Sequence, residues 1–290
     1  MTEPRESLPL DSTAELLTRI TDQLGSQLCH VRLDGTRRDE PEGSPAPALV
    51  AVAHGTPGNR ALPVVTALLA RVRELRPGLD VRLGHMEHNA PLLSDTLGTL
   101  DRGAVLVPLL LGRGYHVKRD LPAAAASVRG HRVRVARPLG PHPLLVEALY
   151  ARLAEAGWGP GHQASRSAAV VLAAAGSRDP DSAADARRTA RMLSERLGGV
   201  PVVPAYASAV SPTVPDAVRA LAARGRHRIA VASYFTAPGR FASACADAAP
   251  WIASAPLGAH PALARLVLQR YDAALAAPRT TPERRELATA

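Results

Sequence analysis

From residue 48 onward the chain alternates short apolar runs with longer segments whose apolar residues recur at helical spacing. The short runs predict buried strands at 48–53, 80–86, 104–111 and 132–139. The helical spacing predicts helices at 62–75, 92–100, 121–128 and 143–157, the last of which closes the first half. Because strands that alternate with helices are typical of β–α–β units, the pattern predicts an α/β fold with a parallel sheet.

The same order of elements returns in the second half of the chain. Apolar runs predict strands at 169–175, 200–206 and 228–235. Helical spacing predicts helices at 181–197, 214–224 and 261–275. We therefore expect two similar doubly wound domains that face one another across a cleft.

An internal duplication underlies this repeated order. Residues 80–100 align without gaps on residues 201–221, which places Pro91 on Pro212, and the same offset aligns residues 52–60 with 173–181 and places Gly55 on Gly176. The segment PLGPHPLL returns later in the chain as PLGAHPAL. The repeat predicts four parts, which are an N-terminal extension, a catalytic half, a degenerate second half and a disordered tail, at 1–47, 48–158, 168–277 and 278–290.

The N-terminal extension lies outside the repeat. Residues 12–28 carry apolar residues near one helical face and favour an amphipathic helix. Residues 34–47 have the composition of a disordered linker. The helix would pack on its own domain or form a dimer contact, so both a monomer and a homodimer stay open.

Composition and charge narrow the function classes. The formal net charge of +9 is explained either by a solvated, arginine-rich surface or by an anionic ligand. Nucleic acid is disfavoured, since no Lys/Arg tract of five or more occurs and aromatic residues make up only 3%. The apolar runs are too short to span a bilayer, and the N-terminus has no signal-peptide pattern. Two isolated cysteines, Cys29 and Cys245, indicate neither a disulfide framework nor a thiolate metal cluster, so we expect a cytoplasmic protein.

Three polar residues of the first half have no polar counterpart of the same kind in the second. His54 aligns with Ala175, Glu87 aligns with Ser208, and His116 aligns roughly with Arg240. Each of the three follows one of the first three predicted strands. Since ligands bind beyond the carboxyl ends of parallel strands, we expect the three to converge in one asymmetric site.

Two histidines and a glutamate suit a borderline divalent metal such as Fe²⁺, Co²⁺, Ni²⁺ or Zn²⁺. Imidazole also titrates near neutral pH, so the set suits proton transfer. His85 and His88 flank Glu87 as further candidate ligands, and strand alternation predicts His85 and Glu87 on one side with His88 on the other. The PLGxHP histidines, which occur in both halves, are predicted to be structural, as helix caps: His142 and His260.

Four segments carry a resemblance to a known family: LVAVAHGT at 49–56, GHMEHNAP at 84–91, VPLLLGRGYHVKRDLP at 107–122 and RPLGPHPLL at 137–145. Together they resemble the sirohydrochlorin chelatases, which are class II chelatases of tetrapyrrole biosynthesis, over residues 48–275. The resemblance implies two flavodoxin-like domains with the macrocycle in the cleft. It also implies a lyase that inserts Fe²⁺ for sirohaem, or Co²⁺ for a cobalamin precursor, and releases two protons.

The resemblance further implies that His54 and His116 bind the metal and accept protons, with Glu87 as their acidic partner. The metal would be the substrate, and no other cofactor is implied. Four cations are candidate contacts for the carboxylates of the tetrapyrrole: Arg113, Lys118, Arg119 and, across the cleft, Arg240. A non-enzymatic metal or tetrapyrrole carrier would need the same ligands, and the sequence does not choose between iron and cobalt.

Overall fold

The computed structural model describes residues 46–58, 60–163 and 165–277 of the 290. They fall within one compact unit, Pro45–Ala290. The predicted helix at 12–28, the linker up to residue 45 and the tail at 278–290 lie outside the described residues. Within the described part of the chain, no helix is both long and apolar enough to cross a membrane.

The first half contains a four-stranded parallel sheet with the strand order β2-β1-β3-β4. Its strands are β1 (Ala48–Ala53), β2 (Val81–His85), β3 (Ala104–Pro108) and β4 (Val133–Val135). The central strand β1 is buried along its whole length, as an apolar run in a parallel sheet covered on both faces should be. In the register, Leu49 lies opposite Val81 on one side and Val105 on the other.

The second half repeats this sheet with the order β6-β5-β7-β8. Its strands are β5 (Ala168–Ala174), β6 (Val202–Tyr206), β7 (Arg228–Tyr234) and β8 (Ile252–Ala253). The register is duplicated as well, because Val52 pairs with Gly84 and Ala173 with Ala205. The predicted pair of similar doubly wound parallel sheets is therefore confirmed.

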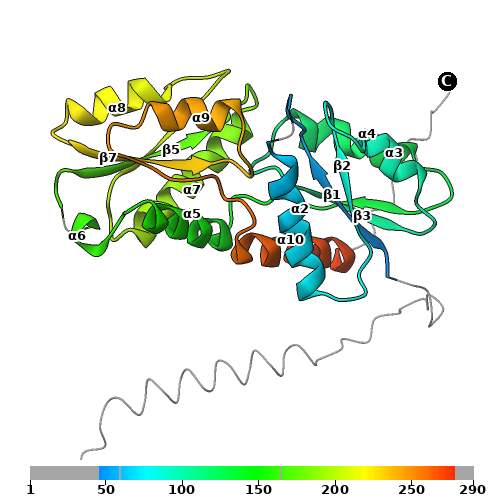
Figure 1. Ribbon diagram of the computed structural model, residues 1–290. Coiled ribbons are helices and arrows are strands. Elements are labelled where there is room, and N and C mark those ends of the chain that lie inside the picture. The colour runs from blue at the N-terminus through cyan, green and yellow to red at the C-terminus, as the bar shows by residue number, and fades with distance from the viewer. Residues whose placement is uncertain (1–45, 59, 164, 278–290) are drawn as a thin grey trace, which may run out of the picture. The chain divides into compact units, whose positions relative to one another are not determined.

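Helices cover both faces of each sheet (Figure 1). The first group, on the upper faces in this view, is α3 (Leu93–Gly98), α4 (Leu121–Ser127), α8 (Val214–Ala222) and α9 (Arg240–Asp247). The second group, on the opposite faces, is α2 (Leu62–Leu75), α5 (Pro143–Glu155), α7 (Pro180–Arg196) and α10 (Pro261–Ala276). A short helix, α6 (Pro160–Gln163), lies between the halves in sequence. The apolar pattern did not predict α6, α9 or β8, because α6 and β8 are very short and α9 is rich in alanine and serine.

The two halves exchange their last helices. From its place in sequence, the helix after residue 142 was expected to close the first half. Instead α5 packs against α7 and β7, and α10 packs against α2, β3 and β4. Sequence periodicity shows that a helix has an apolar face but does not show which sheet receives that face.

Both exchanged helices begin at the repeated PLGxHP segment. His142 Nδ1 accepts a hydrogen bond from the backbone N–H of Leu144 at 3.2 Å, and His260 Nδ1 accepts one from Ala262 at 3.1 Å. Burial lowers the pKa of both imidazoles, which favours the neutral form that an accepting nitrogen requires. The prediction that these two histidines are helix caps is confirmed.

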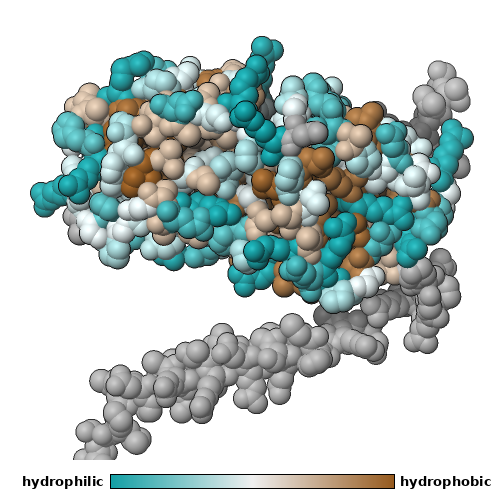
Figure 2. Space-filling model, in the orientation of Figure 1, coloured by the Kyte–Doolittle hydropathy of each residue, from teal (hydrophilic) through white to brown (hydrophobic). Residues whose placement is uncertain are grey.

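One hydrophobic core spans both sheets. It joins Leu49 of β1 and Leu172 of β5 with Leu149 of α5 and Leu266 of α10. Separate smaller cores lie under α3 and α4 and under α8 and α9. Hydrophilic residues cover most of the outer surface in Figure 2, and hydrophobic residues gather near the middle of this face, around α2. Because of the exchange, the sheet of each half packs against a helix that follows the sheet of the other half in sequence.

Candidate active site

The three polar residues meet where three strands of the first sheet end. His54 directly follows β1, Glu87 lies two residues beyond β2, and His116 follows β3 through a loop. All three line one cavity of about 810 Å³ whose other wall comes from the second half. The carboxyl ends of β1, β2 and β3 lie at one edge of the sheet, which brings together residues far apart in sequence.

The side chains of these residues are in contact. His54 Nδ1 lies 3.2 Å from Glu87 Oε1, and the His54 and His116 rings meet edge to face with centroids 4.7 Å apart. Each side chain is partly exposed to the cavity, between 37% and 47%. The three residues therefore lie together in the structure, as the sequence predicted. In the described part of the chain, no three or more His, Cys, Asp or Glu side chains are already grouped to hold a metal ion, this set included.

Close backbone packing holds His54 beside Glu87. The N–H of Glu87 donates to the carbonyl of His54 at 3.0 Å, and the N–H of Thr56 donates to Asn89 Oδ1 at 2.7 Å. Gly55, which lies between His54 and Thr56 in the sequence, has φ +90°. A Cβ on Gly55 would lie 1.7 Å from the Glu87 carbonyl oxygen. Only glycine fits both the left-handed conformation and this approach.

His116 opens a π-helical turn, η1 (His116–Asp120), that leads into α4. Its Nδ1 lies 2.6 Å from Asp120 Oδ2, one turn later. The strand-end pattern does not point to Asp120. Its spacing of four residues from His116 in HVKRD is a signal for this pair only where the segment is helical. The carboxylate fixes the imidazole with its proton on Nδ1, which leaves the Nε2 lone pair to act.

His54 has the same arrangement. Its Nδ1 faces two acceptors, the Glu87 carboxylate and the Gly55 carbonyl oxygen at 3.1 Å. A nitrogen between two oxygens carries the proton, so Nε2 again keeps the lone pair. The two histidines thus present equivalent basic nitrogens, each backed by its own carboxylate.

The two further histidines of the HMEH segment differ in their surroundings. His85 ends β2, is buried, and its Nδ1 donates to the Pro91 carbonyl oxygen at 3.2 Å. His88 has φ +66° and its Nε2 lies 3.5 Å from Glu87 Oε1. The prediction that His88 points away from Glu87 is wrong, because the strand ends at His85 and alternation no longer applies beyond it.

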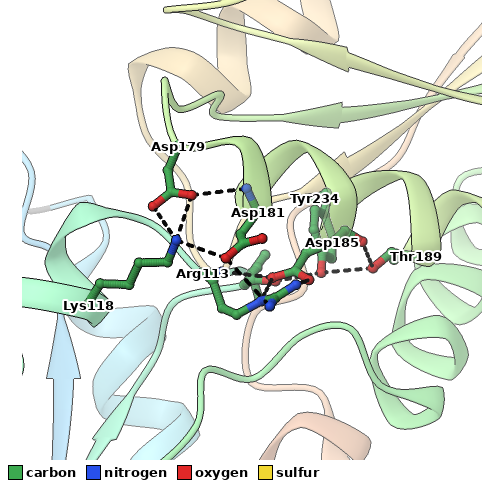
Figure 3. Close-up of polar contacts among 8 residues, drawn as sticks. Arg113, Lys118, Asp179, Asp181, Asp185, Thr189 and Tyr234 are labelled. Atoms are coloured by element: carbon green, nitrogen blue, oxygen red, sulfur yellow. Dashed lines mark hydrogen bonds and ion pairs between the residues drawn. The ribbon is translucent and has the colours of Figure 1, made fainter.

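The four predicted cations have different environments. Arg240 begins α9 and lines the cavity from the second half, with its guanidinium 5.2 Å from the centroid of the Phe241 ring. The other three lie outside the lining of the cavity and are exposed: Arg113, Lys118 and Arg119. Figure 3 shows Arg113 and Lys118 turned to carboxylates of α7 and of its N-cap. The Asp185 carboxylate raises the pKa of Arg113, and Asp179 raises that of Lys118.

The cavity is chemically divided. The first half supplies the imidazoles and the carboxylate, and the second half supplies uncharged side chains and one arginine: Tyr206, Ser208, Phe235, Phe241 and Arg240. Fold and site together define an internally duplicated α/β protein with one asymmetric site. Residues 48–156 and 169–274 match the family described as CbiX, and the chain belongs to that family.

Relatives and solved structures agree with this family. A sirohydrochlorin cobaltochelatase from Priestia megaterium is 28% identical over 162 residues, which cover 53% of this chain and 53% of that protein. A sirohydrochlorin ferrochelatase from Bacillus subtilis (strain 168) is 30% identical over 115 residues, which cover 38% of this chain and 42% of that protein. The chain thus spans about half the length of these curated relatives.

Two solved structures share the fold. SirB from Bacillus subtilis with Fe³⁺ superposes with a TM-score of 0.62 at 22% identity and covers 79% of this chain and 95% of that one. CbiX, the terminal enzyme for biosynthesis of siroheme in denitrifying bacteria, superposes with a TM-score of 0.61 at 23% identity. The match covers 78% of this chain and 99% of that one.

Proposed function

We propose that this protein is a sirohydrochlorin chelatase, a lyase that inserts Fe²⁺ or Co²⁺ into sirohydrochlorin and releases two protons. The observation that carries the proposal is the contact of His54, Glu87 and His116 on one wall of the cavity. Family membership and the names of the relatives support it. The metal is a substrate in this reaction.

In the proposed reaction the macrocycle lies between the two walls, with the metal on the histidine side. Nε2 of His54 and of His116 are the nitrogens free to hold the incoming ion. As the metal enters the ring, two pyrrole N–H protons leave. Transfer of the ion into the ring frees both Nε2 lone pairs. One imidazole then acts as the general base for one proton, and the second proton passes to the other imidazole or to solvent. Glu87, beside His54 Nδ1, stabilises the imidazolium that forms or relays its proton.

Substrate binding in this proposal depends on charge. The net charge of +9 attracts a polyanionic tetrapyrrole, and Arg240 is the predicted cation best placed to bind a carboxylate in the cavity. Arg119 is an exposed candidate outside the lining, whereas Arg113 and Lys118 already hold carboxylates of the second half. The proposed setting is the cytoplasm, with the chain acting as a monomer or a homodimer and without nucleic acid or membrane partners.

An anaerobic absorbance assay tests this function. Catalytic amounts of protein are mixed with excess sirohydrochlorin and either Fe²⁺ or Co²⁺, and loss of the free-base spectrum is followed. Multiple turnovers above the uncatalysed rate establish a chelatase, and the faster metal identifies its preference. Binding of one equivalent without turnover would instead establish the carrier, which is the alternative function.

Asp120→Asn is expected to lower kcat about 10- to 100-fold, because the amide no longer fixes the proton of His116 on Nδ1. The KM for the tetrapyrrole should change little, since Asp120 does not line the cavity. Steady-state kinetics measure both constants. Asp101→Asn, which alters an exposed carboxylate paired with Arg102, is the matched control. Equal kcat in the two variants would remove Asp120 from the site.

A further inference from the structure

The segment that leads from β3 to His116 is bonded to the second half. Thr236 Oγ1 donates to the Leu109 carbonyl oxygen at 2.8 Å, and the Tyr234 hydroxyl donates to the Leu111 carbonyl oxygen at 2.8 Å. Both donors come from β7 or the loop directly after it. Two backbone carbonyls of this first-half segment therefore accept hydrogen bonds from side chains of the second half.

Asp185 of α7 continues this set of contacts. Its carboxylate accepts from the backbone N–H of Arg113 at 2.9 Å, and from Nε and Nη2 of the same residue at 3.0 and 2.7 Å. The Asp185 side chain is only 4% exposed. A buried carboxylate that receives a bidentate guanidinium and a backbone N–H fixes the direction of the chain, because all three donors must be satisfied together.

Asp185 is itself held in place, as Figure 3 shows. Thr189 Oγ1 donates to the Asp185 backbone carbonyl at 3.0 Å and lies 3.2 Å from the Tyr234 hydroxyl. Burial raises the pKa of Tyr234, so the hydroxyl keeps the proton that it donates to Leu111. Asp185, Thr189 and Tyr234 thus form one connected polar group at the contact between the halves.

The far side of His116 is tied down as well. Lys118 Nζ lies 2.7 Å from Asp179 Oδ2 and 2.8 Å from Asp181 Oδ2, at the start of α7. The Lys118 ammonium lowers the pKa of Asp179, which keeps that carboxylate charged. His116 therefore lies between two anchor points, Arg113 and Lys118, that both bind α7 or its N-cap.

The packing leaves little free space at this seam. A Cβ on Gly140 would lie 2.3 Å from both the Leu111 carbonyl oxygen and the Tyr234 hydroxyl. The chain that leads to His116 is thus held by close contacts as well as by hydrogen bonds.

The polar group belongs to the second copy alone. The alignment that places Gly55 on Gly176 places Val64 opposite Asp185 and Leu68 opposite Thr189. The first copy therefore has apolar residues where the second has the carboxylate and the hydroxyl. This asymmetry runs opposite to that of the active site, where the first copy holds the polar residues.

We propose that the second half positions His116, with Asp185 as the principal positioning residue and Tyr234 as its neighbour in the same role. Both act on His116 through the backbone between Leu109 and His116. Asp185 does not line the cavity, whereas Tyr234 does, so the hydrogen exchange of 109–116 is the readout that isolates its positioning role. The catalytic consequence rests on the proposed chelatase function. The ordering of the loop does not, and it is measured separately.

Asp185→Asn keeps the size of the side chain and removes its charge. We expect kcat for metal insertion to fall about 10- to 100-fold, because a small displacement of His116 costs that much in rate. The KM for the tetrapyrrole should stay within about twofold, since Arg240 and the other side chains with which the second half lines the cavity are untouched. Backbone amides of 109–116 should exchange hydrogen for deuterium faster than in the wild type.

Two further variants complete the test. Asp272→Asn also breaks a bidentate Arg–Asp pair, which joins Asp272 of α10 to Arg76, the C-cap of α2. This variant should change neither kcat nor exchange in 109–116. Tyr234→Phe removes one hydroxyl without altering charge, and it should loosen the same amides with a smaller loss of kcat. It provides the test on its own if Asp185→Asn does not fold.

The outcomes separate the two proposals. Unchanged exchange in 109–116 in both folded variants overturns the positioning role, and so does faster exchange spread equally over the whole molecule. Unchanged kcat despite a loosened loop overturns it too. A wild-type protein without turnover defeats the chelatase function, while the exchange measurement still decides whether the second half orders the loop.

Discussion

His116→Ala is expected to lower the rate of metal insertion by about 100- to 10,000-fold. The substitution removes one of the two Nε2 lone pairs, and with it a metal-binding nitrogen or the general base. The fold should persist, because the His116 side chain is 37% exposed and belongs to none of the hydrophobic cores. Anaerobic turnover with Fe²⁺ and with Co²⁺, measured at saturating sirohydrochlorin, gives the rate.

His131→Ala is the matched control for this variant. His131 lies in an exposed loop between α4 and β4, away from the carboxyl ends of the strands, and its loss should leave turnover unchanged. Turnover by His116→Ala within a few-fold of the wild type would remove His116 from the reaction and leave His54 to act without it.

The second large effect is expected from a pair of glycine substitutions. Gly55→Ala places a methyl group 1.7 Å from the Glu87 carbonyl oxygen, and Gly176→Ala places one 2.0 Å from that of Ser208. Both glycines have φ +90°, so each variant should lose at least about 1–3 kcal/mol of unfolding free energy. Chemical denaturation measures this loss.

The two variants should differ in activity because only one strained turn carries chemistry. In Gly55→Ala the clash moves His54 away from Glu87, whereas in Gly176→Ala it moves Ala175 and Ser208. We expect Gly55→Ala to lose about tenfold more kcat than Gly176→Ala at equal folded fraction. Equal losses would mean that the His54–Glu87 contact does not contribute to turnover.

The α/β class and the duplication were readable from sequence. Runs such as 48–53 and 168–174 are apolar at every position because both faces of a parallel strand are covered, and this pattern does not depend on the rest of the fold. Short elements built largely of small residues were not readable. The helix α9, which presents Arg240 to the cavity, is an example.

The site was partly predictable for a related reason. His54, Glu87 and His116 each follow a predicted strand, and parallel strands end at one edge, so their meeting followed from topology. The contact of Asp120 with His116 and the approach of His88 to Glu87 depend on local backbone geometry beyond the strand ends, which the strand pattern does not show. Arg113 and Lys118 were expected to bind substrate, because a sequence shows a positive charge but not the carboxylate that faces it.

The sequence by itself determined the elements, the duplication and the one half that keeps the polar residues, because these follow from local pattern and from comparison of two copies. Only the tertiary structure decided which sheet receives α5 and α10, and that Asp185 and Tyr234 hold the segment before His116. The Asp185 and Tyr234 contacts join residues more than 70 positions apart. Which apolar face meets which, and which charge meets which, is fixed by packing the whole chain and leaves no local signal.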